Sequence, residues 1–299
     1  MNNSFYNSIP TYQSMCEKTE EILWNKSVKS LYIGETVLKR NIPAFSIGHS
    51  YGAILYVGGF HSQEWLTILT MYKFIEDILE SLNENKNLAG IDIAQPLLSR
   101  GIIIVPCINI DGMELVANGF ESAGCHKESV KAISDGNLNC WNANIRGVDI
   151  NHNFDAGYDL VKQMERESGI IGPAPRQYGG ECAESEPETR ALTELCLKYD
   201  VSRVVAFHSQ GEEIFYYYGE NTPVHSKTLA DIFASSCGYE VLEPTGMASH
   251  GGFKDWFVEK MRKPGFTVEI GKGVNPLPVE NFDKIYTKIL EMMTLGMII

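Results

Sequence analysis

The sequence predicts an α/β sandwich built around a largely parallel β-sheet. Short and nearly continuous apolar runs, which are typical of strands buried on both faces, alternate with longer segments whose apolar residues recur at helical spacing. This alternation favours helices that pack on a parallel sheet. The chain contains no linker-like segment and no internal repeat, so we expect one domain over residues 1–299, with residues 1–30 as a helical lead-in.

The first half of the chain is predicted to supply the lead-in helix and the central strands. Between residues 11 and 30, the apolar residues Met15, Ile22 and Leu23 stand among many charges, which favours an amphipathic helix. Uninterrupted apolar runs, such as the one from residue 102, indicate buried strands. We expect, in chain order, a helix over 11–30, short strands at 31–34 and 44–48, a strand at 53–57, a helix over 66–83, a strand at 102–108 and a turn at 109–112.

The second half begins with irregular sequence. Residues 118–145 show no clear period and are predicted to form a long loop, a kind of segment that is often functional. Ser185 and Pro187 are typical of a helix start, because serine caps the first turn and proline fits within it. We expect, in chain order, a further irregular stretch at 168–183, a helix from this start to about 199, strands at 201–207 and 214–219, helices over 224–237 and near 254–260, a strand at 266–271 and a closing helix over 280–296.

Composition narrows the possible functions. A net charge of −13 makes nucleic acid an improbable partner. The seven cysteines are odd in number and form no CxxC pair, which favours free thiols in a reducing compartment and argues against a zinc–cysteine site. We see neither a signal-peptide core at the polar N-terminus nor an apolar run of about 18 residues, so we expect a cytoplasmic protein without a membrane partner. The oligomeric state stays open.

Three predicted strand ends carry the residues that suggest a metal site. His61 and Glu64 follow the run at 53–57 and two glycines, and an imidazole and a carboxylate are ligand types of catalytic zinc. Alone, this pair is a weak signal that an ordinary strand-to-helix loop could also carry. However, His208 and Glu269 lie at the ends of two further predicted strands. Because sites in parallel sheets form at the carboxyl ends of strands, we expect one shared site.

These residues belong to an ordered set of motifs that resembles the zinc metallocarboxypeptidases, the carboxypeptidase A-like peptidases. The resemblance spans about residues 31 to 295 and implies a three-layer α/β/α sandwich with a mixed, largely parallel sheet. Within the family, the chain is most similar to bacterial γ-D-glutamyl-meso-diaminopimelate peptidases, which trim peptidoglycan peptides. This finer likeness rests on residues 147–159 and on the later segments GPAPRQYGG and ESEPETRAL. The family motifs are GFHSQEW at 59–65, NIDG at 109–112, GVDINHNF at 147–154, FHS at 207–209 and FTVE at 266–269.

The resemblance implies a role for each of five residues. His61, Glu64 and His208 would bind one Zn²⁺ and leave a fourth position for water, as a catalytic site needs. Glu269 would be the general base that takes a proton from this water and passes it to the leaving amine. Asp149 would hold His61 through the second ring nitrogen of that histidine.

The chain also departs from the family pattern. Asn151-His152 stands where the family has Asn-Arg, an arginine that binds the C-terminal carboxylate of a substrate. Asn142 stands at the position of the arginine that stabilises the oxyanion, and it can still donate a hydrogen bond. Met247 falls where the family has a mobile tyrosine. We therefore expect Asn142 to act in catalysis, Asn151 and His152 to bind substrate, and the recognised group to differ from an ordinary chain terminus.

Three further residues are candidates for binding a substrate carboxylate. Lys254 precedes Asp255-Trp256, where the family places the base of its specificity pocket. A lysine there would favour an anionic group, and diaminopimelate carries a second carboxylate at the end of its side chain. Arg146 and His250 are the other candidates, and any of the three could instead be a surface residue.

The sequence thus favours a zinc metallopeptidase that hydrolyses the γ-D-glutamyl–meso-diaminopimelate bond of a peptide or muropeptide. Two alternatives remain open. A zinc amidohydrolase of N-acyl amino acids would share the ligand pattern, although the long region 118–183 argues against it. A peptide-binding homologue with weakened catalysis would explain the absent arginines and tyrosine, but not the retained ligands and Glu269.

Overall fold

The computed structural model describes residues 4–243 and 245–299. In this part of the chain, eight strands form one mixed sheet in the order β1-β2-β4-β3-β5-β8-β6-β7. The strands β3, β4, β5 and β8 run parallel to one another. The pairs β1–β2, β2–β4 and β6–β8 are antiparallel, and β7 runs parallel to β6. The strands are β1 (Val28–Glu35), β2 (Asn41–Ile47), β3 (Ile54–Val57), β4 (Ile102–Val105), β5 (Arg203–His208), β6 (Glu213–Phe215), β7 (Glu240–Leu242) and β8 (Gly265–Glu269).

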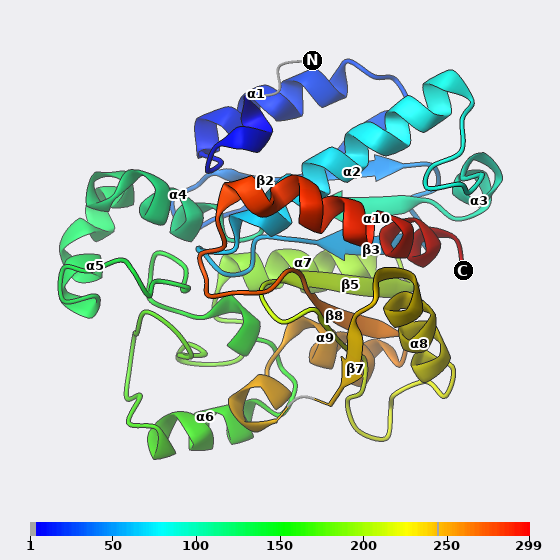
Figure 1. Ribbon diagram of the computed structural model, residues 1–299. Coiled ribbons are helices and arrows are strands. Elements are labelled where there is room, and N and C mark those ends of the chain that lie inside the picture. The colour runs from blue at the N-terminus through cyan, green and yellow to red at the C-terminus, as the bar shows by residue number, and fades with distance from the viewer. Residues whose placement is uncertain (1–3, 244) are drawn as a thin grey trace.

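Helices cover both faces of this sheet, as the predicted α/β sandwich requires (Figure 1). Helix α10 packs against both α2 and α8, and α1 lies over α2. On the sheet, α7 lies against β1 and α9 against β5 and β8. No helix of the described residues is long and apolar enough to cross a membrane. The helices are α1 (Tyr12–Leu23), α2 (Trp65–Glu84), α3 (Ala94–Ser99), α4 (Ile110–Asn118), α5 (Lys127–Ile133), α6 (Tyr158–Glu167), α7 (Pro187–Lys198), α8 (Ser226–Cys237), α9 (Phe253–Trp256) and α10 (Phe282–Ile298).

The central strands confirm the prediction from apolar runs. Every residue of β3, β4 and β5 is buried, because helices cover both of their faces. The Tyr56 ring stacks on Phe74 of α2, and its hydroxyl donates a hydrogen bond to the Met293 carbonyl of α10. The core thus ties the strand that precedes His61 to both long helices.

Several predicted boundaries are wrong, for local reasons. The segment 109–112 begins α4 instead of forming a free turn, because the Asn109 side chain caps this helix by accepting a hydrogen bond from Gly112 N (3.1 Å). The predicted strand at 214–219 is only the three residues of β6. Helix α7 has Glu186, not Ser185, at its N-cap position, although Pro187 is in its first turn as expected. The helices α3 and α6 and the strand β7 were not anticipated.

The predicted long loop at 118–145 is also a correction, because it contains a 3-10 segment (Phe120–His126) and α5. A small apolar core of its own holds this region, in which the Trp141 ring is fully buried. The irregular spacing of these apolar residues conceals the helical period. The other members of this small core are Leu115, Ala123, Val130, Ala143 and Ile145.

Candidate metal centre and active site

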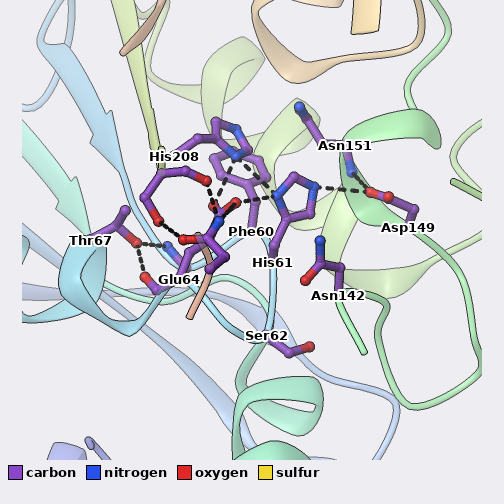
Figure 2. A network of polar contacts seen from close by, with 12 residues as sticks. Phe60, His61, Ser62, Glu64, Thr67, Asn142, Asp149, Asn151 and His208 are labelled. Atoms are coloured by element: carbon purple, nitrogen blue, oxygen red, sulfur yellow. Dashed lines mark hydrogen bonds and ion pairs between the residues drawn. The ribbon is translucent and has the colours of Figure 1, made fainter. Parts of the chain in front are cut away.

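The structure brings His61, Glu64 and His208 together at the carboxyl ends of β3 and β5 (Figure 2). The Nδ1 atom of His61 lies 2.8 Å from Glu64 Oε1 and 3.3 Å from His208 Nδ1, and His208 Nδ1 lies 3.1 Å from Glu64 Oε2. The site is shielded from solvent, since Glu64 is 3% exposed and His208 is 1% exposed. Two imidazoles and a carboxylate thus converge on one point.

The glycines before His61 create the turn that makes this convergence possible. Gly59 has a φ of 64°, in the left-handed region that favours glycine, and a Cβ there would lie 2.8 Å from Cys107 Sγ. The amide of Gly59 donates to Thr67 Oγ1 (2.9 Å), and this hydroxyl donates to the Glu64 carbonyl (2.7 Å). The loop that carries the histidine and the carboxylate is therefore fastened to the first turn of α2.

Asp149 fixes the ring of His61 from the other side. Figure 2 shows His61 between Glu64 and Asp149, with His61 Nε2 3.2 Å from Asp149 Oδ1. The Asp149 carboxylate also accepts hydrogen bonds from the amides of Asn151 (3.2 Å) and Gln177 (2.9 Å). Burial raises the pKa of Asp149, but the charges of His61 and His152 outweigh burial and lower that pKa below its usual range.

Replacing Asp149 with Asn is therefore expected to weaken zinc binding by about 10- to 100-fold, because His61 loses the carboxylate that orients it and raises its basicity. Competition with a chromophoric chelator would measure the zinc affinity. Asp155→Asn, which removes an exposed carboxylate that pairs with Lys260, is the matched control. An unchanged zinc affinity in Asp149→Asn would contradict this role.

The donor set fits a zinc ion. Tetrahedral ligands at zinc bond lengths stand about 3.3 Å apart, which is close to the separations between the three donor atoms. Burial lowers the pKa of His61, but the charges of Glu64 and Asp149 hold it well above its ordinary value, so the site favours positive charge. Burial lowers the pKa of His208 and keeps this imidazole neutral, as a metal ligand must be.

Glu269 ends β8 directly beside the metal donors. It pairs in register with His208 across the parallel strands β5 and β8. Burial, followed by the charge of Glu64, raises the pKa of Glu269 well above its ordinary value. A carboxylate whose pKa is moved toward neutrality suits a group that both accepts and returns a proton.

A cleft of about 720 Å³ opens over these residues. His61 and Glu269 line it, together with Asn151, His152 and Lys254, three of the residues that the sequence proposed for substrate binding. Nδ1 of His152 is buried and has no hydrogen-bond partner among the described residues. The cleft therefore brings Glu269 and three of the residues predicted for substrate binding together beside His61.

Three of the residues predicted for catalysis or substrate binding do not line the cleft. Arg146 is about half exposed and pairs with Glu186 (3.5 Å), and His250 lies against Tyr218, with Nδ1 3.4 Å from the hydroxyl. Neither position supports the predicted contact with a substrate carboxylate. Asn142 is buried near His61, but its backbone makes the contacts seen, since its amide donates to the Pro175 carbonyl (2.8 Å) and its Oδ1 has no partner among the described residues. The side chain of Met247 lies outside the described part of the chain.

Sequence reasoning missed three charged residues of the cleft, Arg176, Glu213 and Glu243. Arg176 lies on a segment fastened to the site, because the Pro175 carbonyl accepts from Asn142 N and Gln177 N donates to Asp149. Its charge lies in a stretch without periodicity, so no pattern could place it. Glu213 could have been found from the alternation along β6, had the register of that strand been known.

Comparison with known proteins agrees with this geometry. A profile of the zinc carboxypeptidase family matches residues 24–291. The chain is 35% identical over 267 residues to the γ-D-glutamyl-L-diamino acid endopeptidase 1 of Lysinibacillus sphaericus, an alignment that covers 89% of this chain and 66% of that protein. It is 33% identical over 258 residues to the uncharacterized protein YqgT of Bacillus subtilis, with coverages of 85% and 68%. The chain thus spans about two thirds of the length of these relatives.

A solved structure confirms the predicted fold class. Thrombin-activatable fibrinolysis inhibitor superposes with a TM-score of 0.75 at 16% identity, over 99% of this chain and 75% of that chain. At this identity the likeness concerns the fold alone. The profile match over most of the chain, together with the cluster of His61, Glu64 and His208, places this protein in the zinc carboxypeptidase family, whose cofactor is one zinc ion.

Proposed function

We propose that this protein is a zinc metallopeptidase that hydrolyses the γ-D-glutamyl–meso-diaminopimelate bond of peptidoglycan peptides. The observation that carries the proposal is a His-Glu-His donor set whose His61 lines one cleft together with Glu269, a carboxylate of raised pKa, and Lys254, a buried lysine. The name of the Lysinibacillus sphaericus relative, a γ-D-glutamyl-L-diamino acid endopeptidase, supports this choice of bond.

In this proposal His61, Glu64 and His208 hold the metal, which polarises the scissile carbonyl and acidifies a water molecule when bound. Glu269 accepts a proton from the attacking water and returns it to the amine that leaves. The side-chain amide of Asn142 would donate a hydrogen bond to the developing oxyanion when this side chain turns toward the cleft.

The cations of the cleft suit a substrate with several carboxylates. The Lys254 ammonium donates to the Tyr217 carbonyl (2.9 Å) and pairs with Asp255, which leaves one of its three donors for a ligand. Arg176 has no hydrogen bond or ion pair with a described residue. A γ-linked glutamate keeps its α-carboxylate free, and Arg176 is suited to bind this group, while Lys254 is suited to the distal carboxylate of diaminopimelate.

The linkage itself tests the proposal. Wild-type protein with zinc is expected to release free diaminopimelate from L-Ala-γ-D-Glu-meso-diaminopimelate and to cleave the α-linked isomer at least about tenfold more slowly, because the isomer displaces the free carboxylate from its cation. Mass spectrometry of timed digests measures both rates. Equal rates would argue against γ-glutamyl recognition. Cleavage of N-acyl amino acids in place of both peptides would favour the amidohydrolase alternative.

His152 is proposed to hold the substrate, in the place of the family's arginine. Its Nδ1 is buried at the cleft wall without a partner among the described residues, so a ligand carboxylate would satisfy it. His152→Ala is expected to raise KM by about tenfold and to change kcat less, because a binding contact acts on the ground state and the transition state alike. Steady-state kinetics on the γ-linked tripeptide measure both constants. His49→Ala, at an exposed position, is the control, and an unchanged KM in His152→Ala would rule out this role.

A cytoplasmic location and a role in recycling muropeptides are part of the same proposal. All seven cysteines are free thiols, including the exposed Cys125, Cys140 and Cys182. Exposed thiols persist in reducing compartments. Fractionation of cells with an antibody against this protein would locate it.

A further inference from the structure

One face of the strand pair β6–β8 looks into the cleft. The two strands are antiparallel, and Glu213 lies opposite Glu269 while Phe215 lies opposite Thr267. Directly opposed residues project to the same side of a sheet, and all four side chains line the cleft. The residue between Glu213 and Phe215, Ile214, is fully buried on the other face. The alternation therefore places Glu213 in the cleft next to the proposed general base.

Glu213 has no cationic partner. Among the described residues, none forms a hydrogen bond or an ion pair with its carboxylate. Its neighbour Glu212, by contrast, does not line the cleft and is neutralised by Lys288 (2.7 Å) and Lys272 (3.5 Å). The charge of Glu213 also contributes to the raised pKa of Glu269, after burial and Glu64. A partly buried acid beside a second acid costs free energy in the free protein, and this cost is offset when a ligand brings positive charge.

The cleft wall next to Glu213 fits an aliphatic arm. Phe215 offers an apolar surface two residues along the same strand, and Leu242 of the neighbouring strand β7 also lines the cleft. A side chain that lies along Phe215 would carry its terminal group among the charged residues. An ordinary apolar pocket would not require an acid here, and a pocket for a purely anionic side chain would be weakened by one.

We propose that Glu213 is a specificity-determining residue that binds the side-chain ammonium of a diamino acid in the leaving group. This inference rests on the proposed function. It assigns to Glu213 the ammonium that lysine and diaminopimelate share, while Lys254 remains the partner for the additional carboxylate of diaminopimelate. The selected class of leaving group is thus a diamino acid. Diaminopimelate is the member of this class that both Glu213 and Lys254 would bind.

Four tripeptides, L-Ala-γ-D-Glu-X, separate these contributions. The residue X is meso-diaminopimelate, whose side chain ends in an ammonium and a carboxylate, or L-lysine, which has the ammonium alone. The other two are L-2-aminopimelate, which has the carboxylate alone, and L-norleucine, which has neither. Wild-type protein is expected to cleave the lysine peptide with a kcat/KM about 10- to 100-fold above that of the norleucine peptide, the effect of one charge-assisted hydrogen bond. Glu213→Gln is expected to remove this advantage. It lowers kcat/KM for the diaminopimelate and lysine peptides, leaves the norleucine peptide within about twofold and does not lower kcat/KM for the aminopimelate peptide.

Glu212→Gln, which removes an equal charge from a neighbouring residue that does not line the cleft, is the matched control and should not change the order of the four substrates. An equal loss on all four peptides in Glu213→Gln would overturn the inference, because it would show a general effect on Glu269. A loss that disappears when the L-Ala amine is acetylated would also overturn it, since the recognised ammonium would then lie on the acyl side.

The wild-type series tests the inference even without a folded variant. Preference for lysine over norleucine supports it. Equal cleavage of all four peptides would overturn the inference and leave the proposed function standing. Cleavage of none of them would overturn both.

Discussion

Replacing Glu269 with Gln is expected to lower kcat by about 10²- to 10⁴-fold, the usual contribution of a general acid–base group. Glutamine keeps the shape of the side chain but can neither accept a proton from water nor return one to the leaving amine. Zinc should still bind, because the donors on His61, Glu64 and His208 are unchanged. Steady-state kinetics on the γ-linked tripeptide, with zinc content measured on the same sample, would show the loss.

The control for this variant is Glu280→Gln, an exposed acid near the start of α10, which should change kcat by no more than about twofold. Retained turnover in Glu269→Gln would show that another group moves the proton. A loss accompanied by loss of zinc would show that Glu269 acts through the metal site. Turnover by wild type that disappears in Glu269→Gln would also exclude a protein that only binds peptides.

Replacing His208 with Ala is expected to abolish zinc binding at micromolar metal and to lower kcat/KM by at least about 10³-fold. The metal contributes several kcal/mol to the transition state, and each 1.4 kcal/mol corresponds to about tenfold in rate. The imidazole of His208 is fully enclosed, so solvent supplies no equivalent ligand without rearrangement.

Thermal unfolding gives an independent measurement for this variant. Zinc should raise the Tm of wild type and of His49→Ala, because a ligand that binds only the folded state stabilises it, and should leave the Tm of His208→Ala unchanged. His49 lies at an exposed position and serves as the matched histidine control. A zinc-dependent Tm in His208→Ala equal to that of wild type would contradict the ligand role.

Much of the fold could be predicted because its central strands are continuously apolar. The runs that became β3, β4 and β5 are buried on both faces, so their composition alone indicates their place. The edge elements follow no such rule. Among the described strands, β7 has three residues and pairs with β6 alone. Helix α6 is largely polar and buries the charged Glu165 as well as Val161, so neither element leaves a strong apolar pattern.

The sequence indicated the metal donors and Glu269, but it did not indicate several of the charged residues that line the cleft. His61, Glu64, His208 and Glu269 follow strands whose carboxyl ends meet at one edge, so the order of elements was sufficient to gather them. Arg146 does not line the cleft and pairs with Glu186, a contact between segments far apart in sequence that no local pattern indicates.

Glu213 and Arg176 could not be found from the sequence for related reasons. The position of Glu213 depends on the antiparallel register of β6 against β8, which turns alternate residues of a three-residue strand into the cleft. The position of Arg176 depends on hydrogen bonds from its neighbours to Asn142 and Asp149, which lie more than twenty residues earlier in the chain.

The most direct test of the account is a zinc titration of metal-free protein in the presence of L-Ala-γ-D-Glu-meso-diaminopimelate. We expect no release of diaminopimelate before zinc is added, and a rate that rises linearly until one equivalent is bound, with free diaminopimelate and L-Ala-D-Glu as the only products. Release without metal, or one bound equivalent of zinc without cleavage of the γ-glutamyl bond, would contradict it.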